Sequence, residues 1–117
     1  MGVEEAIRFF DKWRCSGVRI HCVLLPSPEG GAWSLNALCV VHSVSSQALV
    51  LAFSSDASLT LSMQECRFSS PKKPEDSVLG KALGHRAKYE CSIGVSFSKG
   101  ESLILAEMKQ SQDGSVR

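Results

Sequence analysis

The spacing of apolar side chains changes at Gly17, and this change limits the folds open to the chain. Before Gly17, apolar residues recur at intervals of three and four, as on one face of a helix: Val3, Ala6, Ile7, Phe10 and Trp13. Glycine readily adopts the left-handed conformation that ends many helices, so we expect the helix to end there. After Gly17, apolar residues alternate or run together almost to the end of the chain, which is the pattern of β-strands.

The strands are predicted to form a single, mainly β domain, because 117 residues suffice for one core and not for two. After the helix at 1–17 we expect a small, strongly bent antiparallel barrel at 18–70 and a polar loop with a short helix at 71–86. A C-terminal β-hairpin extension at 87–108 and a frayed tail at 109–117 complete the prediction. The predicted core combines the helix with the inward sides of the strands: Ile7, Phe10, Ile20, Cys22, Leu35, Cys39, Val41, Leu49, Leu51, Leu61 and Ile104.

Composition argues against several classes of protein. The net charge of +1 is small for a dedicated DNA-binding or membrane-surface protein. No stretch approaches the roughly 20 apolar residues that span a bilayer. Residues 1–13 carry too many charges for a signal peptide. We therefore expect a cytoplasmic protein that does not bind membranes, with its five cysteines present as reduced thiols.

No motif in the sequence predicts catalysis, a metal site or a cofactor. The most suggestive spacing is Cys39 with His42, but residues three apart on a strand point to opposite faces. The chain contains neither a C-x-x-C pair nor the G-x-S-x-G motif of a nucleophilic serine. We expect a protein that is not an enzyme.

A basic segment is the candidate for binding nucleic acid or another anion: Lys72, Lys73, Arg86 and Lys88, next to Tyr89. Basic side chains beside an aromatic ring can hold a phosphate backbone and stack a base. The same charges can simply keep a loop beside an apolar sheet from aggregating, and this interpretation is favoured. Any affinity for nucleic acid is expected to be weak and to fall steeply with salt.

The order of helix, strand, loop, long strand, tight turn and strand resembles the Sm-like proteins, a class of SH3-like small barrel. The resemblance lies in the helix Ile7–Trp13, the strand Val18–Leu25 and the region Trp33–Phe68, above all in its strand–polar turn–strand segment Leu38–Leu51. It implies a barrel whose strand edges pair between subunits into a ring. The turn His42–Gln47 lacks the aspartate and asparagine of RNA-binding members, so RNA binding is not implied.

The segment Leu59–Phe68 is predicted to be an edge strand with few residues that would block pairing. Glu65 and Arg67 come only near its end, and no proline interrupts it. We therefore expect a non-enzymatic, self-assembling binding module that forms a homo-oligomer. The alternative is a small-ligand binder or small enzyme that uses a histidine at the barrel mouth as its acid–base group: His21, His42 or His85.

Overall fold

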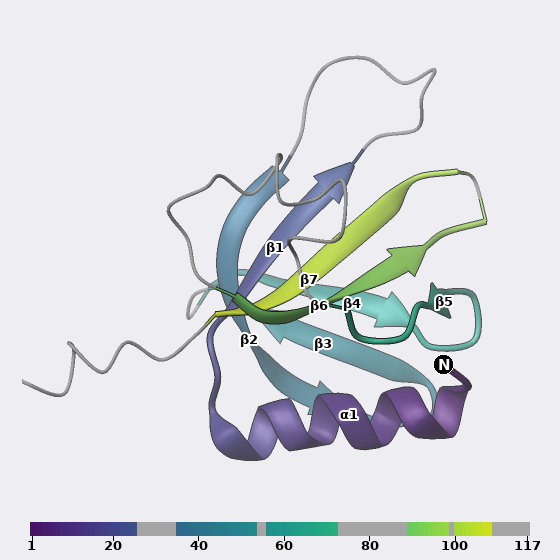
Figure 1. Ribbon diagram of the computed structural model, residues 1–117, viewed down its shortest axis with the longest axis horizontal. Coiled ribbons are helices and arrows are strands. Elements are labelled where there is room, and N and C mark those ends of the chain that lie inside the picture. Colours follow the sequence, from purple (N-terminus) through teal and green to yellow (C-terminus); the bar gives the residue numbers. More distant parts are fainter. Residues whose placement is uncertain (26–34, 54–55, 73–88, 99, 109–117) are drawn as a thin grey trace, which may run out of the picture.

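The fold is one N-terminal helix and a seven-stranded antiparallel sheet in the order β4-β3-β2-β1-β7-β6-β5 (Figure 1). A computed structural model describes residues 1–25, 35–53, 56–72, 89–98 and 100–108. The elements are α1 (Val3–Ser16), β1 (Ile20–Leu25), β2 (Leu35–Val44), β3 (Ala48–Ala52), β4 (Ser58–Ser62), β5 (Arg67–Phe68), β6 (Tyr89–Ser96) and β7 (Ser102–Met108). Among the described residues, no helix is both long and apolar enough to cross a lipid bilayer.

Helix α1 ends as its sequence predicts and buries its apolar face. Gly17 adopts a left-handed conformation with a φ of 64°, and its N–H donates to the carbonyl of Arg14 at 3.2 Å. Phe10 is fully buried, and its ring lies 5.6 Å from the ring of Trp13 and 5.6 Å from that of Phe68. The helix is therefore attached to the sheet through an aromatic cluster.

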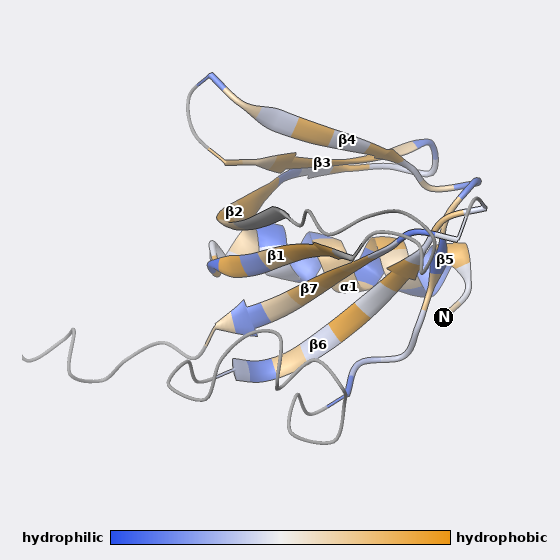
Figure 2. Ribbon diagram, turned by 90° about the horizontal axis from the view of Figure 1, so that it is seen from above, coloured by the Kyte–Doolittle hydropathy of each residue, from blue (hydrophilic) through white to orange (hydrophobic). Residues whose placement is uncertain are grey.

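Strand β2 bends the sheet so that its two halves face each other. The strand pairs with β1 along its first part and with β3 along its second part. Between Val41 and Ser43 the register with β3 shifts by one residue, and such a bulge increases the local bend of a strand. Strands β3 and β4 consequently form one layer and β1, β7 and β6 another, as Figure 2 shows from above.

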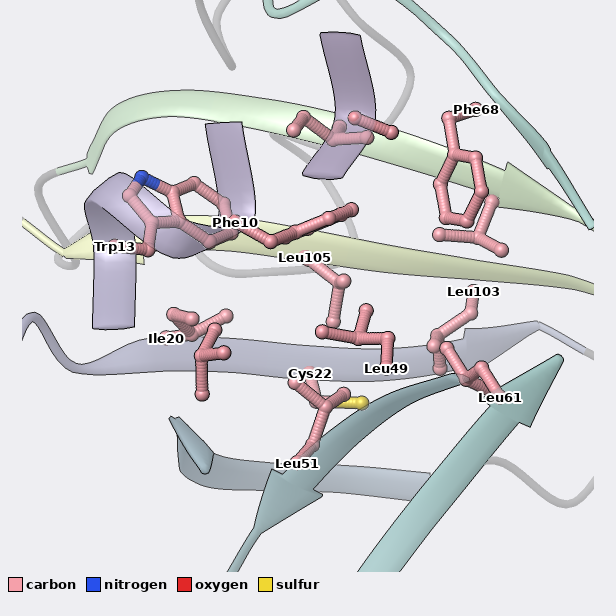
Figure 3. Close-up of a cluster of buried hydrophobic side chains, with 14 of the residues drawn as sticks. Phe10, Trp13, Ile20, Cys22, Leu49, Leu51, Leu61, Phe68, Leu103 and Leu105 are labelled. Atoms are coloured by element: carbon pink, nitrogen blue, oxygen red, sulfur yellow. The ribbon is translucent and has the colours of Figure 1, made fainter. Parts of the chain in front are cut away.

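The main hydrophobic core fills the space between the two layers and the helix. Leu49, Leu51 and Leu61 project from β3 and β4 toward Cys22, Leu103 and Leu105 on β1 and β7 (Figure 3). A smaller cluster lies on the opposite face of β1 and β7, where Val23 and Ala106 are buried. Central strands β1 and β7 therefore carry apolar residues on both faces.

The prediction of a mainly β protein with an N-terminal helix is confirmed, but the sheet is not closed into a barrel. The hairpin of β6 and β7 is not an extension either, because β7 lies between β1 and β6 in the middle of the sheet. The predicted strand Leu59–Phe68 is two strands, β4 and β5, separated by a turn.

The predicted core residues are mostly buried, with three differences. Ile7 is only half-buried, and buried Ile104 pairs with Val23 on the face away from the main core. The side chain of Leu35 lies outside the part of the chain that is described, as do residues 73–86 of the predicted polar loop and the tail 109–117.

Candidate functional site: the open edge of the sheet

Strand β4 forms one edge of the sheet, and its hydrogen-bonding pattern shows which backbone groups point away from β3. The N–H of Met63 donates to the carbonyl of Gln47 at 3.0 Å, and the N–H of Phe53 donates to the carbonyl of Ala57 at 2.9 Å. In an antiparallel ladder, hydrogen-bonded and non-hydrogen-bonded pairs alternate. In the register of β3 and β4, the backbone groups of Leu59 and Leu61 therefore bond to β3. The backbone groups of Ser58, Thr60 and Ser62 point outward.

We call the N–H and C=O groups of Ser58, Thr60 and Ser62 the outward groups of β4. No described residue hydrogen-bonds to them, and Figure 2 shows β4 at the margin of its layer. The strand contains neither a proline nor a charged side chain, the usual devices that keep an edge from pairing with another chain. Ser58 and Thr60 are exposed, and Leu59 is half-buried. Within the part of the chain that the structure describes, the outward groups of β4 are therefore available to pair with another strand.

The opposite edge, β5, is short and partly blocked. Its two residues pair with β6, and the N–H of Ser69 donates to the carbonyl of Gly94 at 2.9 Å. The same alternation makes Phe68 the outward residue of β5. Its carbonyl accepts a hydrogen bond from the N-terminal ammonium of Met1 at 2.8 Å. Figure 1 shows the N-terminus beside β5.

A second exposed feature is an apolar hollow on the outer face of β2. Leu38 and Val40 are 45% and 38% exposed, which is high for large apolar side chains on a central strand. The hollow has a volume of about 340 Å³ and is lined by Arg19, Leu38, Cys39, Val40, Ala52 and Phe53. The guanidinium of Arg19 could pair there with an anionic group of a ligand.

Of the three histidines considered for acid–base chemistry, His21 has the most defined surroundings. Its Nδ1 lies 2.7 Å from the hydroxyl oxygen of Tyr89, within a hydrogen bond. Partial burial raises the pKa of Tyr89. His42 is exposed at the bulge of β2, and His85 lies outside the described residues. The sequence associated Tyr89 with the basic segment, whereas the structure pairs it with His21.

Of the four predicted basic binding residues, the structure describes only Lys72. This residue is exposed, and its backbone N–H and C=O bond to Ser92 at 2.9 and 2.7 Å. Lys73, Arg86 and Lys88 lie outside the described residues, so the basic site as a whole stays a prediction.

The cysteines form no disulfide: Cys15 is exposed, Cys91 is half-buried, and Cys22, Cys39 and Cys66 are buried. Cys22 on β1 and Cys39 on the adjacent strand β2 lie diagonally opposite each other, and their hydrogen bond together with burial raises the pKa of Cys39. Burial, with a smaller effect of Glu107, raises the pKa of Cys91 to about 12. The described residues contain no group of three or more His, Cys, Asp or Glu side chains placed to hold a metal ion.

The comparisons with known proteins give no family assignment. No family model, no curated protein and no solved structure matches the chain significantly. Function is therefore inferred from the residues and the geometry alone.

The sequence predicted an edge strand at Leu59–Phe68, and its first part belongs to β4, which is an edge of the sheet. The absence of prolines and charges between residues 58 and 62 is visible in the sequence. The sequence missed the blocking of β5 by Met1, which depends on contacts between distant segments. It also did not single out the hollow. The available signal was the alternation of β2, where Leu38 and Val40 are apolar at positions opposite the inward Cys39 and Val41.

Proposed function

We propose that this protein is a non-enzymatic binding module that assembles with copies of itself through the edge of its sheet. The observation that carries the proposal is the run of outward groups on β4, which no described residue satisfies and no charge or proline protects. Such an edge is a template for pairing with another strand.

The charge of the chain supports self-association. With 13 basic and 12 acidic residues, the net charge is +1, so two copies repel each other little on approach. The Sm-like resemblance favours the same conclusion and extends it to a ring, in which β4 would pair with an edge strand of the next subunit.

The experiment is a proline substitution at an outward position. Ser62→Pro removes an N–H that points away from β3, so the ladder between β3 and β4 is kept while an intermolecular donor is lost. The mass measured by light scattering should fall toward that of one chain, and the far-UV circular dichroism should keep its β-sheet signal. Ser46→Pro, at an exposed position in the turn between β2 and β3, is the matched control and should leave the assembly intact.

Two results would count against self-association through β4. One is a wild-type protein that is monomeric at high micromolar concentration. The other is a Ser62→Pro variant that remains folded and assembled.

We propose that the binding function lies in the apolar hollow beside Arg19. Exposed apolar side chains next to a cation suit a ligand that presents an apolar group and a carboxylate. Replacing Leu38 with Ser should weaken such binding without changing the assembly, because Leu38 lies on β2, away from the β4 edge.

The second candidate is acid–base chemistry at His21, favoured by its 2.7 Å hydrogen bond with Tyr89. We rank it second because Tyr89 packs against Val23 and Ala106, so the hydrogen bond also serves to satisfy polar groups beside a buried cluster. Nucleic-acid binding by Lys72, Lys73, Arg86 and Lys88 is proposed only as a weak, salt-sensitive interaction.

A further inference from the structure

The two edges of the sheet differ in length and in available backbone groups, and this difference limits how two copies can pair. Strand β4 offers three outward residues: Ser58, Thr60 and Ser62. Strand β5 offers only Phe68, whose carbonyl already accepts a hydrogen bond from Met1. A head-to-tail contact of β4 with β5 would therefore leave most outward groups of β4 without partners.

We propose that β4 pairs antiparallel with β4 of a second copy, about a two-fold axis that passes beside Thr60. This inference rests on the proposed self-association and replaces a ring with a closed dimer. A two-fold contact uses the same surface on both subunits, so β4 meets an edge of equal length and equal openness. The occupant of the edge is a second copy of this chain.

One register satisfies all the outward groups. With Thr60 opposite Thr60 of the second copy, Ser58 lies opposite its Ser62 and Ser62 opposite its Ser58. Each of these three pairs exchanges two hydrogen bonds, because the backbone N–H and C=O groups of all these residues point away from β3. A shift of the two-fold axis by one residue leaves one outward residue of each copy unpaired, so the Thr60-centred register is favoured.

The side chains also match in this register. On the inner face, Leu59 lies opposite Leu61 of the second copy, in a non-hydrogen-bonded pair where side chains approach closely. Leu59 is half-buried in the single chain, so the contact covers apolar surface that is otherwise accessible. On the outer face, hydroxyl side chains meet hydroxyl side chains, a favourable cross-strand combination, and no like charges face each other.

The contact is small, which sets the expected affinity. Stable interfaces usually bury about 800 Å² on each partner, more than two five-residue strands provide. We expect a reversible dimer with a dissociation constant in the micromolar range, roughly the weak end for specific complexes. Dilution should return the protein to single chains.

The test uses the fact that residue 60 faces residue 60 of the second copy in the Thr60-centred two-fold dimer, and does not do so when β4 pairs with β5. Thr60→Lys places two ammonium groups opposite each other, and Thr60→Glu places two carboxylates there. At low ionic strength each variant alone should give the mass of one chain by light scattering. An equimolar mixture of the two variants should restore the mass of two chains. The control pair Ser46→Lys and Ser46→Glu, at the exposed β2–β3 turn, should dimerise like the wild type, alone or mixed.

The possible outcomes separate the two proposals. Wild-type protein heavier than two chains, or a mixture of Thr60 variants that stays monomeric while each variant is folded, overturns the two-fold pairing and leaves self-association standing. Wild-type protein that is monomeric at high micromolar concentration overturns both.

A cross-link gives a second measure that does not depend on charge. Opposed residues of a hydrogen-bonded pair have Cα atoms about 5.5 Å apart, within the range that a disulfide bridges. In a Cys15→Ser background, Thr60→Cys treated with oxidised glutathione should give a covalent dimer, whereas Ser46→Cys should not. Failure of Thr60→Cys to cross-link at a concentration where it associates would contradict the register.

Discussion

At the scale of single residues, a polar contact holds the end of the helix to the sheet. The indole N–H of Trp13, whose side chain is buried, donates to Oε1 of Glu107 on β7 at 2.8 Å. The thiol of Cys91 on β6 lies 3.7 Å from the same oxygen. One carboxylate therefore serves a helix and two strands, and its loss should affect stability.

Replacing Glu107 with Ala should lower the free energy of unfolding by about 1–3 kcal/mol, because the buried indole N–H of Trp13 loses its acceptor. Glu107→Gln keeps an oxygen at that position and should cost less. Urea denaturation of the variants at one protein concentration measures the difference. If Glu107→Ala and Glu107→Gln unfold at the wild-type midpoint, the contact contributes nothing to stability.

The thiols should differ sharply in reactivity at pH 8. Only Cys15 is exposed, and burial keeps reagent from Cys22 and Cys39. Burial also raises the pKa of Cys66 and, with a smaller effect of Glu107, that of Cys91 to about 12. A raised pKa leaves less of the reactive thiolate at this pH. Brief treatment with iodoacetamide should therefore modify Cys15 alone, as seen by peptide mass spectrometry, and all five cysteines should react after denaturation. Rapid native labelling of Cys91 would contradict this expectation and show that its half-buried thiol on β6 is accessible to the reagent.

At the scale of elements, helix α1 is attached mainly through Phe10. Its ring is fully buried between Trp13 and Phe68, and removal of a large buried side chain leaves a cavity. Phe10→Ala should lower the free energy of unfolding by about 3–5 kcal/mol. Val3→Ala, on the same helix but 39% exposed, is the control and should change it by less than about 0.5 kcal/mol. Equal midpoints for Phe10→Ala and wild type would show that the helix is not docked.

The helix and most strands could be predicted from the sequence because their signals are local. Apolar spacing and Gly17 determine the helix, and alternation determines the strands. The end of β4 could not be predicted in this way, because Met63 continues the alternation of Leu59 and Leu61 although it lies in a turn, where both Met63 and Cys66 are buried. A buried turn and a buried strand have similar compositions.

The sheet is open and not the predicted barrel, because closure depends on which strands become neighbours. Alternation shows that a strand has two faces and does not show that β7 inserts between β1 and β6. The candidate site could be predicted only in part. The lack of charges along β4 is a local feature, but the direction of each N–H follows from the register with β3.

At the scale of the whole molecule, the two edges of the sheet differ: among the described residues, β4 has no partner on its outer side and β5 is partly blocked. Three residues of β4 present outward groups that no described residue binds, whereas on β5 the outward carbonyl of Phe68 accepts a hydrogen bond from the N-terminal ammonium of Met1. With a net charge of +1, electrostatic repulsion does little to keep two open edges apart. The asymmetry of the edges favours pairs of molecules over rings.

The native mass of the wild-type protein at high micromolar concentration tests this account most directly. Light scattering should give twice the 12.7 kDa of one chain, and the value should fall toward one chain on dilution. A mass of 12.7 kDa at every concentration would contradict the central claim that the β4 edge pairs with a second copy.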